Sequence, residues 1–418
     1  MGGGTLAADV LVVGAGPGGS AAAYHLARHG ADVLLVDRAT FPRDKVCGDG
    51  LTPRGVAGIE RMGVAWRDSP SFARADGLRT YGTEGAVLDL AWPTLRSWPN
   101  LGLVCRRADL DHLLVRRAVA AGARLLEGAE VLRPTTDGVW VTGAVLNGTG
   151  PEREVRARFV VAADGHASRF AGAAGVRRDP TRAIGIAARR YYRSPRPFEP
   201  ILESFLNLRA GGGVIGGYGW IFFLPDGVVN VGAGVLSTFK GFRDVSARSV
   251  FDAFVRGLPP HWGITEDNAL SPVRSGPLPT AMNRTPLAVP GLLLVGDAAG
   301  MVNPFNGEGI SCAIESGELA AELIVDALAR NRPGVTQLYP SILRERYGRY
   351  YHVGNAWARL IGDPRFMRLA VKYAIPRKRL MTFAMRLLAN LSDGKDGDLQ
   401  DRVMHLLLSL APERPRAA

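Results

Sequence analysis

Three glycines near the N-terminus have the spacing of a dinucleotide-binding turn, G-x-G-x-x-G. They are Gly14, Gly16 and Gly19. In this pattern the first glycine makes a tight turn, the second lets a pyrophosphate approach the backbone, and the third lets a helix pack closely on a strand. The turn lies between a buried strand predicted at residues 9–13 and an alanine-rich helix predicted at residues 20–29, whose N-terminal N–H groups face the phosphates. Asp37 ends a second predicted strand about twenty residues farther on, in position for a ribose hydroxyl, so we expect a bound dinucleotide.

Two further segments indicate that the dinucleotide is FAD. Residues 292–299 resemble the second FAD fingerprint of glutathione-reductase-type flavoproteins, in which the aspartate, here Asp297, contacts the ribityl chain. Residues 161–165 resemble the D-G motif of flavin hydroxylases, with Asp164 as its aspartate. Each segment follows a short apolar run that predicts a buried strand.

Two more segments complete the pattern. Residues 107–111 resemble the R-x-x-L-D helix start that contacts FAD in flavin hydroxylases. Residues 303–309 open a predicted helix at 309–329, and the dipole of its N-terminus can stabilise negative charge on reduced flavin. Each segment alone could be a strand-to-turn junction, but all of them in this order are hard to assign otherwise. The residues expected to contact FAD are Gly14, Gly16, Gly19, Asp37, Arg38, Cys47, Gly48, Arg107, Asp164, Gly296, Asp297, Asn306, Gly307 and Gly309.

The most specific resemblance lies in residues 41–54 and 217–222. The first segment looks like the one that marks the geranylgeranyl reductase family, and the second resembles that family's Y-x-W-x-F substrate-cavity motif. The match covers almost the whole chain and is closest to actinobacterial members, which include the menaquinone reductases. Those enzymes saturate a double bond in the isoprenoid tail of the quinone. The family usually has proline after the phenylalanine of the motif, but this chain has Phe223, so the accepted chain length and head group stay open.

The resemblance implies an FAD-dependent oxidoreductase that acts on CH–CH groups of a polyprenyl substrate, either the menaquinone tail or a geranylgeranyl lipid or diphosphate. An isolated alkene has no carbonyl to hold a carbanion. Proton donation must therefore lead or accompany hydride transfer from flavin N5, and aromatic ring faces can stabilise the cationic character that builds on carbon. Tyr218, Trp220 and Phe222 alternate along a predicted strand, so one parity faces the cavity. From the pattern alone such rings more often fill a sheet core, and the resemblance favours the cavity.

Cys47 is the candidate proton donor, and with Tyr218 and Trp220 it makes up the expected catalytic set. A neutral thiol beside the flavin could donate a proton. Lys45 and Arg43 lie close in sequence and are expected to lower the pKa of the thiol, which favours thiolate and argues against a resting acid. Two alternatives stay open: Cys47 is a small buried residue in a flavin-contacting loop, or water above the flavin donates the proton.

These residues require elements that bring distant segments together, and the pattern predicts an α/β fold. We expect an FAD-binding Rossmann-like domain of the glutathione reductase type, similar to that of flavin hydroxylases, with an inserted antiparallel β-sheet substrate domain and C-terminal helices. The chain has 418 residues and is 47% hydrophobic, enough for such a core. The expected domains are residues 1–75, 100–180 and 275–330 for FAD binding, 76–99 and 181–274 for the substrate, and 331–418 for the helical region.

The net charge of +12 is unusual for an ordinary cytosolic enzyme. Cations between residues 344 and 386 alternate with apolar residues, a pattern of basic amphipathic helices that can lie on an anionic bilayer. Ordinary capping helices with solvated arginines are the alternative. Nucleic acid is not expected, because no recognition module accompanies the charge. With no signal peptide and no apolar run of roughly 18–20 residues, we expect a cytoplasmic protein held peripherally at the membrane.

Metal and disulfide chemistry are not expected, because the three cysteines are scattered along the chain. They are Cys47, Cys105 and Cys312.

A flavin-dependent hydroxylase of an aromatic or polyketide metabolite is the main alternative function, since it shares the glycine turn, the D-G motif and the second fingerprint. A halogenase is a weaker variant, because residues 218–222 only loosely resemble the tryptophan pair of halogenases and the expected lysine is not identifiable. A flavin protein without turnover, such as an electron-transfer partner, is disfavoured by an enclosed aromatic cavity. The external electron donor, NADPH or another reductant, and the oligomeric state stay open.

Overall fold

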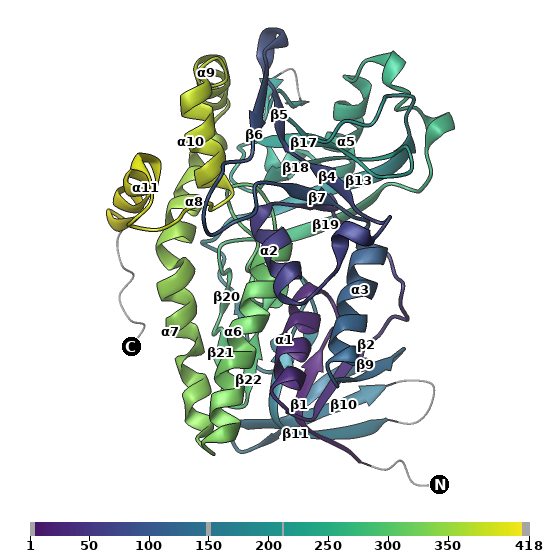
Figure 1. The fold of residues 1–418 in the computed structure, drawn as a ribbon, viewed down its shortest axis with the longest axis vertical. Helices are drawn as coiled ribbons and strands as arrows, with labels where there is room; N and C mark the ends of the chain where they lie inside the picture. The colour runs from purple at the N-terminus through teal and green to yellow at the C-terminus, as the bar shows by residue number, and fades with distance from the viewer. Residues whose placement is uncertain (1–4, 148–151, 211–212, 412–418) are drawn as a thin grey trace.

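The computed structural model describes residues 5–147, 152–210 and 213–411, which are built around two large sheets (Figure 1). In the view of Figure 1, the first sheet lies at the lower end with α1, α3 and α6 beside it, and the second sheet lies at the upper end. The C-terminal helices run along one side of both. The predicted class, an α/β fold with an antiparallel sheet and C-terminal helices, is confirmed.

The first sheet is largely parallel, and its central strands are buried on both faces. Its order is β21-β22-β11-β1-β2-β8, and β10 and β9 extend it in antiparallel fashion from β11. Apolar runs such as residues 10–13 form its interior strands because both faces of a parallel sheet are covered. The strands are β1 (Leu6–Val13), β2 (Val33–Asp37), β8 (Arg124–Glu127), β9 (Glu130–Asp137), β10 (Trp140–Asn147), β11 (Arg153–Ala162), β21 (Ala288–Val289) and β22 (Leu292–Leu294).

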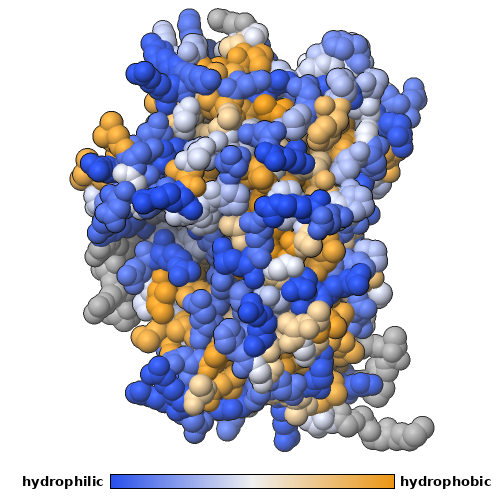
Figure 2. Space-filling view, viewed as in Figure 1, coloured by the Kyte–Doolittle hydropathy of each residue, from blue (hydrophilic) through white to orange (hydrophobic). Residues whose placement is uncertain are grey.

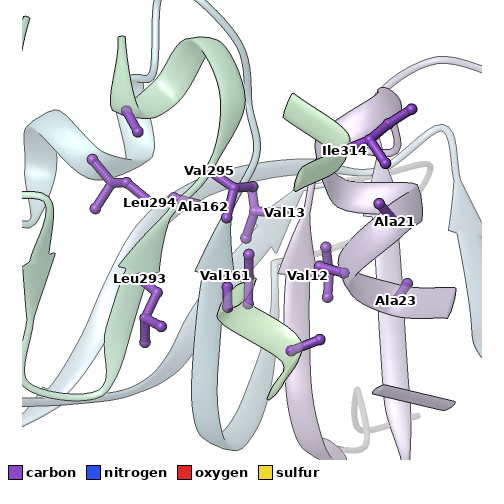
Figure 3. Packing of buried hydrophobic residues seen from close by; sticks show 14 of the residues in the cluster. Val12, Val13, Ala21, Ala23, Val161, Ala162, Leu293, Leu294, Val295 and Ile314 are labelled. Atoms are coloured by element: carbon purple, nitrogen blue, oxygen red, sulfur yellow. The ribbon is translucent and has the colours of Figure 1, made fainter. Parts of the chain in front are cut away.

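Two helices beside this sheet, α1 and α6, pack closely against each other. A Cβ atom at Gly317 of α6 would lie 2.3 Å from the carbonyl oxygen of Gly18 in α1, so the two backbones approach closely at this glycine. Figure 3 shows Val12 of the sheet, Ala21 of α1 and Ile314 of α6 among the buried residues of this core. The helices of this region are α1 (Pro17–Arg28), α2 (Pro53–Arg61), α3 (Arg107–Ala120), α4 (Arg169–Ala173) and α6 (Ile310–Ala329).

The second sheet has the order β19-β13-β18-β17-β14-β5-β6 and is antiparallel except for the β5–β14 pair. Helix α5 (Ala247–Arg256) covers one face, where Phe251 and Phe254 pack in one apolar cluster with Phe223 and Val231. The strands are β5 (Gly77–Tyr81), β6 (Val87–Ala91), β13 (Ile184–Arg193), β14 (Leu202–Phe205), β17 (Gly217–Phe223), β18 (Val228–Leu236) and β19 (Arg274–Pro279). Shorter strands are β3 (Gly50–Leu51), β4 (Ala73–Ala75), β7 (Gly102–Val104), β12 (Arg177–Arg178), β15 (Arg209–Ala210), β16 (Gly213–Val214) and β20 (Arg284–Thr285).

The chain then continues as a series of C-terminal helices. Met367, Val371 and Ile375, at the spacing of one helix face, form a small apolar cluster with Ile361. A π-helical turn at residues 344–348 joins the first two helices. The helices are α7 (Tyr339–Leu343), α8 (Arg349–Ile361), α9 (Pro364–Ala374), α10 (Lys378–Leu388) and α11 (Leu399–Ser409).

Helix α1 and strand β1 begin earlier than the sequence predicts. Helix α1 begins at Pro17 rather than at residue 20, because proline suits the first helical position, where its missing N–H has no partner to lose. Strand β1 begins at Leu6, since pairing with β11 extends back to Leu6 and Val155.

Candidate active site

The glycine turn of residues 14–19 is shaped by close backbone contacts. Gly14 has a φ of +97°, and a Cβ atom there would lie 2.5 Å from the carbonyl oxygen of Ala163. At Gly19 a Cβ atom would lie 1.8 Å from the carbonyl oxygen of Gly14. Gly16 differs, because its nearest neighbour would be an Arg43 nitrogen at 3.9 Å. The turn therefore leaves open space only at the glycine that a pyrophosphate must approach, which fits a dinucleotide.

A cavity of about 950 Å³ begins at this turn. Its lining includes every residue expected to contact FAD except Gly19, which instead packs α1 onto the turn. Because α1 starts at the cavity with no side chain capping its first N–H groups, those groups remain for phosphate oxygens. The residues present thus fit FAD, with its pyrophosphate at α1.

Near Asp37, two carboxylates fix the cavity wall by accepting hydrogen bonds from the backbone and from arginines. Asp37 Oδ2 accepts a hydrogen bond from the backbone N–H of Ala15 at 2.8 Å, which ties the glycine turn to the end of β2. Asp111 accepts from Arg107 through both carboxylate oxygens at 2.7 Å, and from Arg43 at 2.9 Å. These pairs hold two guanidinium groups on the cavity wall. Arg38 also lines the wall and is exposed.

The two other FAD segments follow neighbouring strands, β11 and β22, and both border the cavity. Asp164 Oδ1 accepts from the hydroxyl of Ser168 at 2.8 Å, so the D-G carboxylate supports its own turn. Asp297 lies 3.3 Å from the ammonium group of Lys45, which joins the second fingerprint to the loop of residues 41–49. Residues separated by more than 250 positions in the chain thus border one site.

The start of α6 closes the site near the second sheet. Asn306, Gly307 and Gly309 line the cavity directly before the helix begins at Ile310. The hydroxyl of Tyr218 donates to the carbonyl oxygen of Asn306 at 2.7 Å. This bond fixes the phenol beside the helix N-terminus, where negative charge on a reduced flavin would be stabilised.

The strand β17 lines the cavity with three aromatic rings of one parity, Tyr218, Trp220 and Phe222. Their neighbouring ring centroids are 5.8 Å and 6.4 Å apart. Phe223 points to the other face and lies buried in the core under α5. The rings press on the loop of residues 47–50, because a Cβ atom at Gly50 would lie 2.9 Å from the Phe222 ring.

The expected thiolate at Cys47 is wrong. Burial raises the pKa of the thiol, although the nearby Arg107 guanidinium lowers it. Lys45 and Arg43, the cations expected to lower it, are turned to Asp297 and Asp111 instead. Cys47 therefore lines the cavity as a neutral thiol, which removes the objection to a proton at Sγ.

The cavity continues as an apolar branch under the C-terminal helices, which the sequence reasoning missed. The apolar residues between 344 and 386 were expected to face a bilayer, but Met367, Ile375 and Met381 among them line the cavity. The helical spacing of the α9 residues was the available signal, and it could not say which face was covered. The branch is lined by Trp357, Ile361, Met367, Ala370, Val371, Ala374, Ile375, Met381, Ala384 and Leu388.

The outer face of these helices carries cations next to exposed apolar side chains. Leu369, Tyr373 and Leu380 are about half exposed, and α11 exposes Leu399 and Leu410 even more. Figure 2 shows hydrophobic and hydrophilic residues side by side over α9, α10 and α11. The exposed cations between residues 365 and 379 are Arg365, Arg368, Lys372, Arg377, Lys378 and Arg379.

Arg386 does not belong to this cationic face. It is buried and pairs with Asp398 and Asp401 at 2.7 Å and 2.6 Å, which joins α10 to the start of α11. The outer basic face therefore ends before Arg386.

The structure describes residues 5–147, 152–210 and 213–411. There, no helix combines the length and apolar character that crossing a bilayer requires. In the same residues no group of histidine, cysteine, aspartate and glutamate side chains is arranged to hold a metal ion.

Comparison with known proteins gives relatives over nearly the whole chain. Residues 7–189 match the family model described as FAD binding domain. A menaquinone reductase of Mycolicibacterium smegmatis is 39% identical over 401 residues, 95% of this chain and 95% of that protein. A digeranylgeranylglycerophospholipid reductase of Thermoplasma acidophilum is 30% identical over 344 residues, 82% of this chain and 84% of that protein.

Among solved structures, a geranylgeranyl bacteriochlorophyll reductase-like protein of Thermoplasma acidophilum is similar in fold. It aligns with a TM-score of 0.78 at 23% identity, over 97% of this chain and all of that one.

Proposed function

Because this chain belongs to the geranylgeranyl reductase family of FAD-dependent oxidoreductases, we propose that it reduces isolated C=C bonds in an isoprenoid chain. The cofactor is FAD. We take the tail of menaquinone as the first substrate, since the similarity to the mycobacterial menaquinone reductase spans 95% of both chains. A geranylgeranyl lipid or diphosphate is the second. The observation that carries the proposal is a single cavity that joins the FAD turn, three aromatic rings and an apolar branch.

The reduction needs a hydride, a proton and stabilisation of the positive charge that develops on the alkene carbon. FAD, when bound and reduced, supplies the hydride from N5. The rings of Tyr218, Trp220 and Phe222 present π-faces to carbon that gains cationic character, and a desolvated contact of this kind is worth about 2 kcal/mol. Excluding water from this part of the cavity strengthens the same electrostatic contact.

The proton donor is proposed to be Cys47. Its thiol is neutral because burial raises its pKa, and it lies on the cavity wall beside Gly48 and the aromatic strand. Tyr218 is the second candidate, since burial raises the pKa of its phenol and the bond to Asn306 orients it. Water in the same space is the third. The variants Cys47→Ala and Tyr218→Phe distinguish the three candidates. Only loss of the true donor lowers the rate of the step that incorporates solvent deuterium.

The apolar branch is proposed to hold the isoprenoid tail. Its wall consists of aliphatic, methionine and tryptophan side chains from α8, α9 and α10. Burial of each methylene of a tail in such a branch contributes about 0.8 kcal/mol. A flexible tail needs this contribution because binding removes its conformational freedom.

Peripheral association with an anionic membrane is proposed for the outer face of the same helices. Arg368 and Lys372 stand beside Leu369 and Tyr373 on one exposed stretch of α9. Cations near an anionic surface contribute about 1 kcal/mol each, and exposed apolar side chains can enter the headgroup boundary. The test is sedimentation with anionic and neutral vesicles. Binding to anionic vesicles that falls with salt is expected, and full recovery in the supernatant would contradict the proposal.

An external reductant, NADPH or another donor, is proposed to reduce the flavin between turnovers. The first experiment avoids that step. The yellow protein is reduced anaerobically with dithionite, mixed with long-chain menaquinone or geranylgeranyl diphosphate, and followed by flavin reoxidation and product mass. A gain of two hydrogens in the prenyl chain is expected from the stoichiometry of C=C reduction. A flavin that stays reduced until air is admitted, with both substrates unchanged, would favour the hydroxylase alternative.

A further inference from the structure

A buried carboxylate outside the cavity wall connects the flavin-side loop to the aromatic strand. Asp49 follows Cys47-Gly48 in the chain, is fully buried, and has a φ of +66°, which is uncommon for a residue with a side chain. Its Oδ2 accepts from the hydroxyl of Tyr191 at 2.6 Å and from Nδ2 of Asn230 at 2.8 Å. Backbone strain at a buried polar residue is typical of functional sites.

Asn230 also forms hydrogen bonds with two residues that line the cavity. Its Nδ2 also donates to the carbonyl oxygen of Cys47 at 2.9 Å, and its Oδ1 accepts from the indole N–H of Trp220 at 3.0 Å. Asn230 is itself fully buried on β18. One amide therefore holds both the loop that carries the candidate proton donor and the central ring of the aromatic wall.

The direction of these hydrogen bonds is determined by chemistry. An indole N–H can only donate, so Asn230 must present its oxygen to Trp220. Its two N–H groups then need two acceptors, which are the Cys47 carbonyl and the Asp49 carboxylate. An ionised carboxylate only accepts, and its hydrogen bonds are roughly twice as strong as neutral ones. Without the charge of Asp49, that N–H of Asn230 would keep at most a neutral acceptor, and the amide would be held more weakly.

The ring of Trp220 has little room for any other position. A Cβ atom at Gly232 would lie 2.1 Å from its six-membered ring, and one at Gly48 would lie 3.2 Å from its nitrogen. The two glycines leave room for the same edge of the indole, and the bond to Asn230 selects the rotation of the ring. If the amide turned, the indole would lose the hydrogen bond that fixes its orientation at the cavity wall.

We propose that Asp49 is a positioning residue for alkene reduction, acting through Asn230 on the Trp220 ring and on the Cys47 loop. This inference rests on the proposed function for its effect on turnover. Its structural core, the control of Trp220 by Asp49, does not depend on which substrate is reduced. Asp49 itself does not line the cavity and is not a catalytic residue.

The test is a double-mutant cycle read by fluorine NMR. The FAD-loaded protein is labelled with 5-fluorotryptophan, and the Trp220 signal is identified by its loss in Trp220→Phe. Asp49→Asn and Asn230→Leu are each expected to shift this signal and to lower kcat about fivefold to tenfold with FAD content unchanged. The double variant should show no further loss, because both changes interrupt one chain of contacts. Additive losses in kcat, or an unmoved Trp220 signal in Asp49→Asn, would overturn the proposal.

A matched control is Glu203→Gln. Glu203 is equally buried and accepts from a tyrosine, Tyr81, at 2.8 Å, but it also pairs with Arg196. It lies opposite Ile221 on β17, so its side chain is on the other face of the sheet from the Trp220 ring. Its substitution should leave the Trp220 signal in place. If Asp49→Asn does not fold, Tyr191→Phe removes one donor to Asp49 and must still move the signal. A signal that responds in a protein that reduces no prenyl chain would overturn the proposed function alone.

Discussion

The glycine turn and the aromatic strand line different parts of one cavity, and they reach their shapes by opposite means. At Gly14 and Gly19 the backbone lies so close to other backbone atoms that no side chain fits. At Trp220 and Phe222 large rings fill the space that distant glycines leave open. The cofactor part thus requires glycines, which have no side chain, at positions that are close together in the sequence. The substrate part depends on large side chains whose partners are remote, so it can vary by substitution while the cofactor part cannot.

The largest effect is expected at the cofactor part. Gly19→Val should abolish FAD binding, because its Cβ atom would lie 1.8 Å from the carbonyl oxygen of Gly14 and α1 would have to move away. The purified variant should be colourless, as its flavin absorbance would show. Gly172→Ala is the control, since a Cβ atom there meets nothing within 4 Å, and it should stay yellow. A yellow Gly19→Val protein would contradict the role given to backbone contact.

The next effect is expected at the aromatic part, with the cofactor retained. Trp220→Leu keeps an apolar side chain but removes the ring, and prenyl reduction should fall about 30-fold, the equivalent of about 2 kcal/mol. The measurement is single-turnover reoxidation of the reduced flavin by substrate. Phe223→Leu is the control, because Phe223 packs under α5 on the other face of the strand. Equal losses in both variants would mean that the rings act only through packing.

The same contrast explains how much of the molecule could be predicted from its sequence. The glycine turn, the Asp37 strand end and the parity of Tyr218, Trp220 and Phe222 were all readable, because each depends on spacing within a short segment. The burial of residues 10–13 followed from a continuous apolar run.

Features that depend on partners far along the chain were missed. The thiolate assigned to Cys47 failed because Lys45 and Arg43 pair with Asp297 and Asp111, which sequence proximity could not indicate. The inner face of α9 was assigned to the membrane because apolar residues at helical spacing predict a covered face but do not identify what covers it. The role of Asp49 could not be predicted, since Tyr191 and Asn230 are more than 140 positions away.

A smaller effect is expected in the apolar branch. Ala374→Phe should narrow it and lower kcat/KM for long tails about tenfold relative to short ones, because roughly two methylenes of burial are worth that factor. The measurement is competition between prenyl substrates of two lengths. Leu369→Phe places the same side chain on the exposed face of α9 and should leave the ratio unchanged. An unchanged ratio in Ala374→Phe would mean that the tail lies elsewhere.

The last expected effect is on stability rather than on turnover, and it concerns the carboxylate that joins the two parts of the cavity. Burial raises the pKa of Asp49 from 3.8 to about 6, although hydrogen bonds from Tyr191 and Asn230 lower it. The folded state therefore binds this proton more tightly than the unfolded state. The stability that Asp49 contributes is fully present below pH 3.8 and is lost as the pH rises through about 6.

Asp49→Asn should consequently raise the free energy of unfolding at pH 7.5 by on the order of 1–3 kcal/mol relative to the parent, with a smaller gain at pH 4.5. The measurement is urea unfolding of both proteins at the two pH values, with the difference between them as the quantity compared. If the difference in unfolding free energy between the two proteins is the same at both pH values, ionisation of the Asp49 carboxylate does not destabilise the fold. A variant that is more stable yet slower would mean that the fold keeps a destabilising charge at this position because the aromatic wall depends on it.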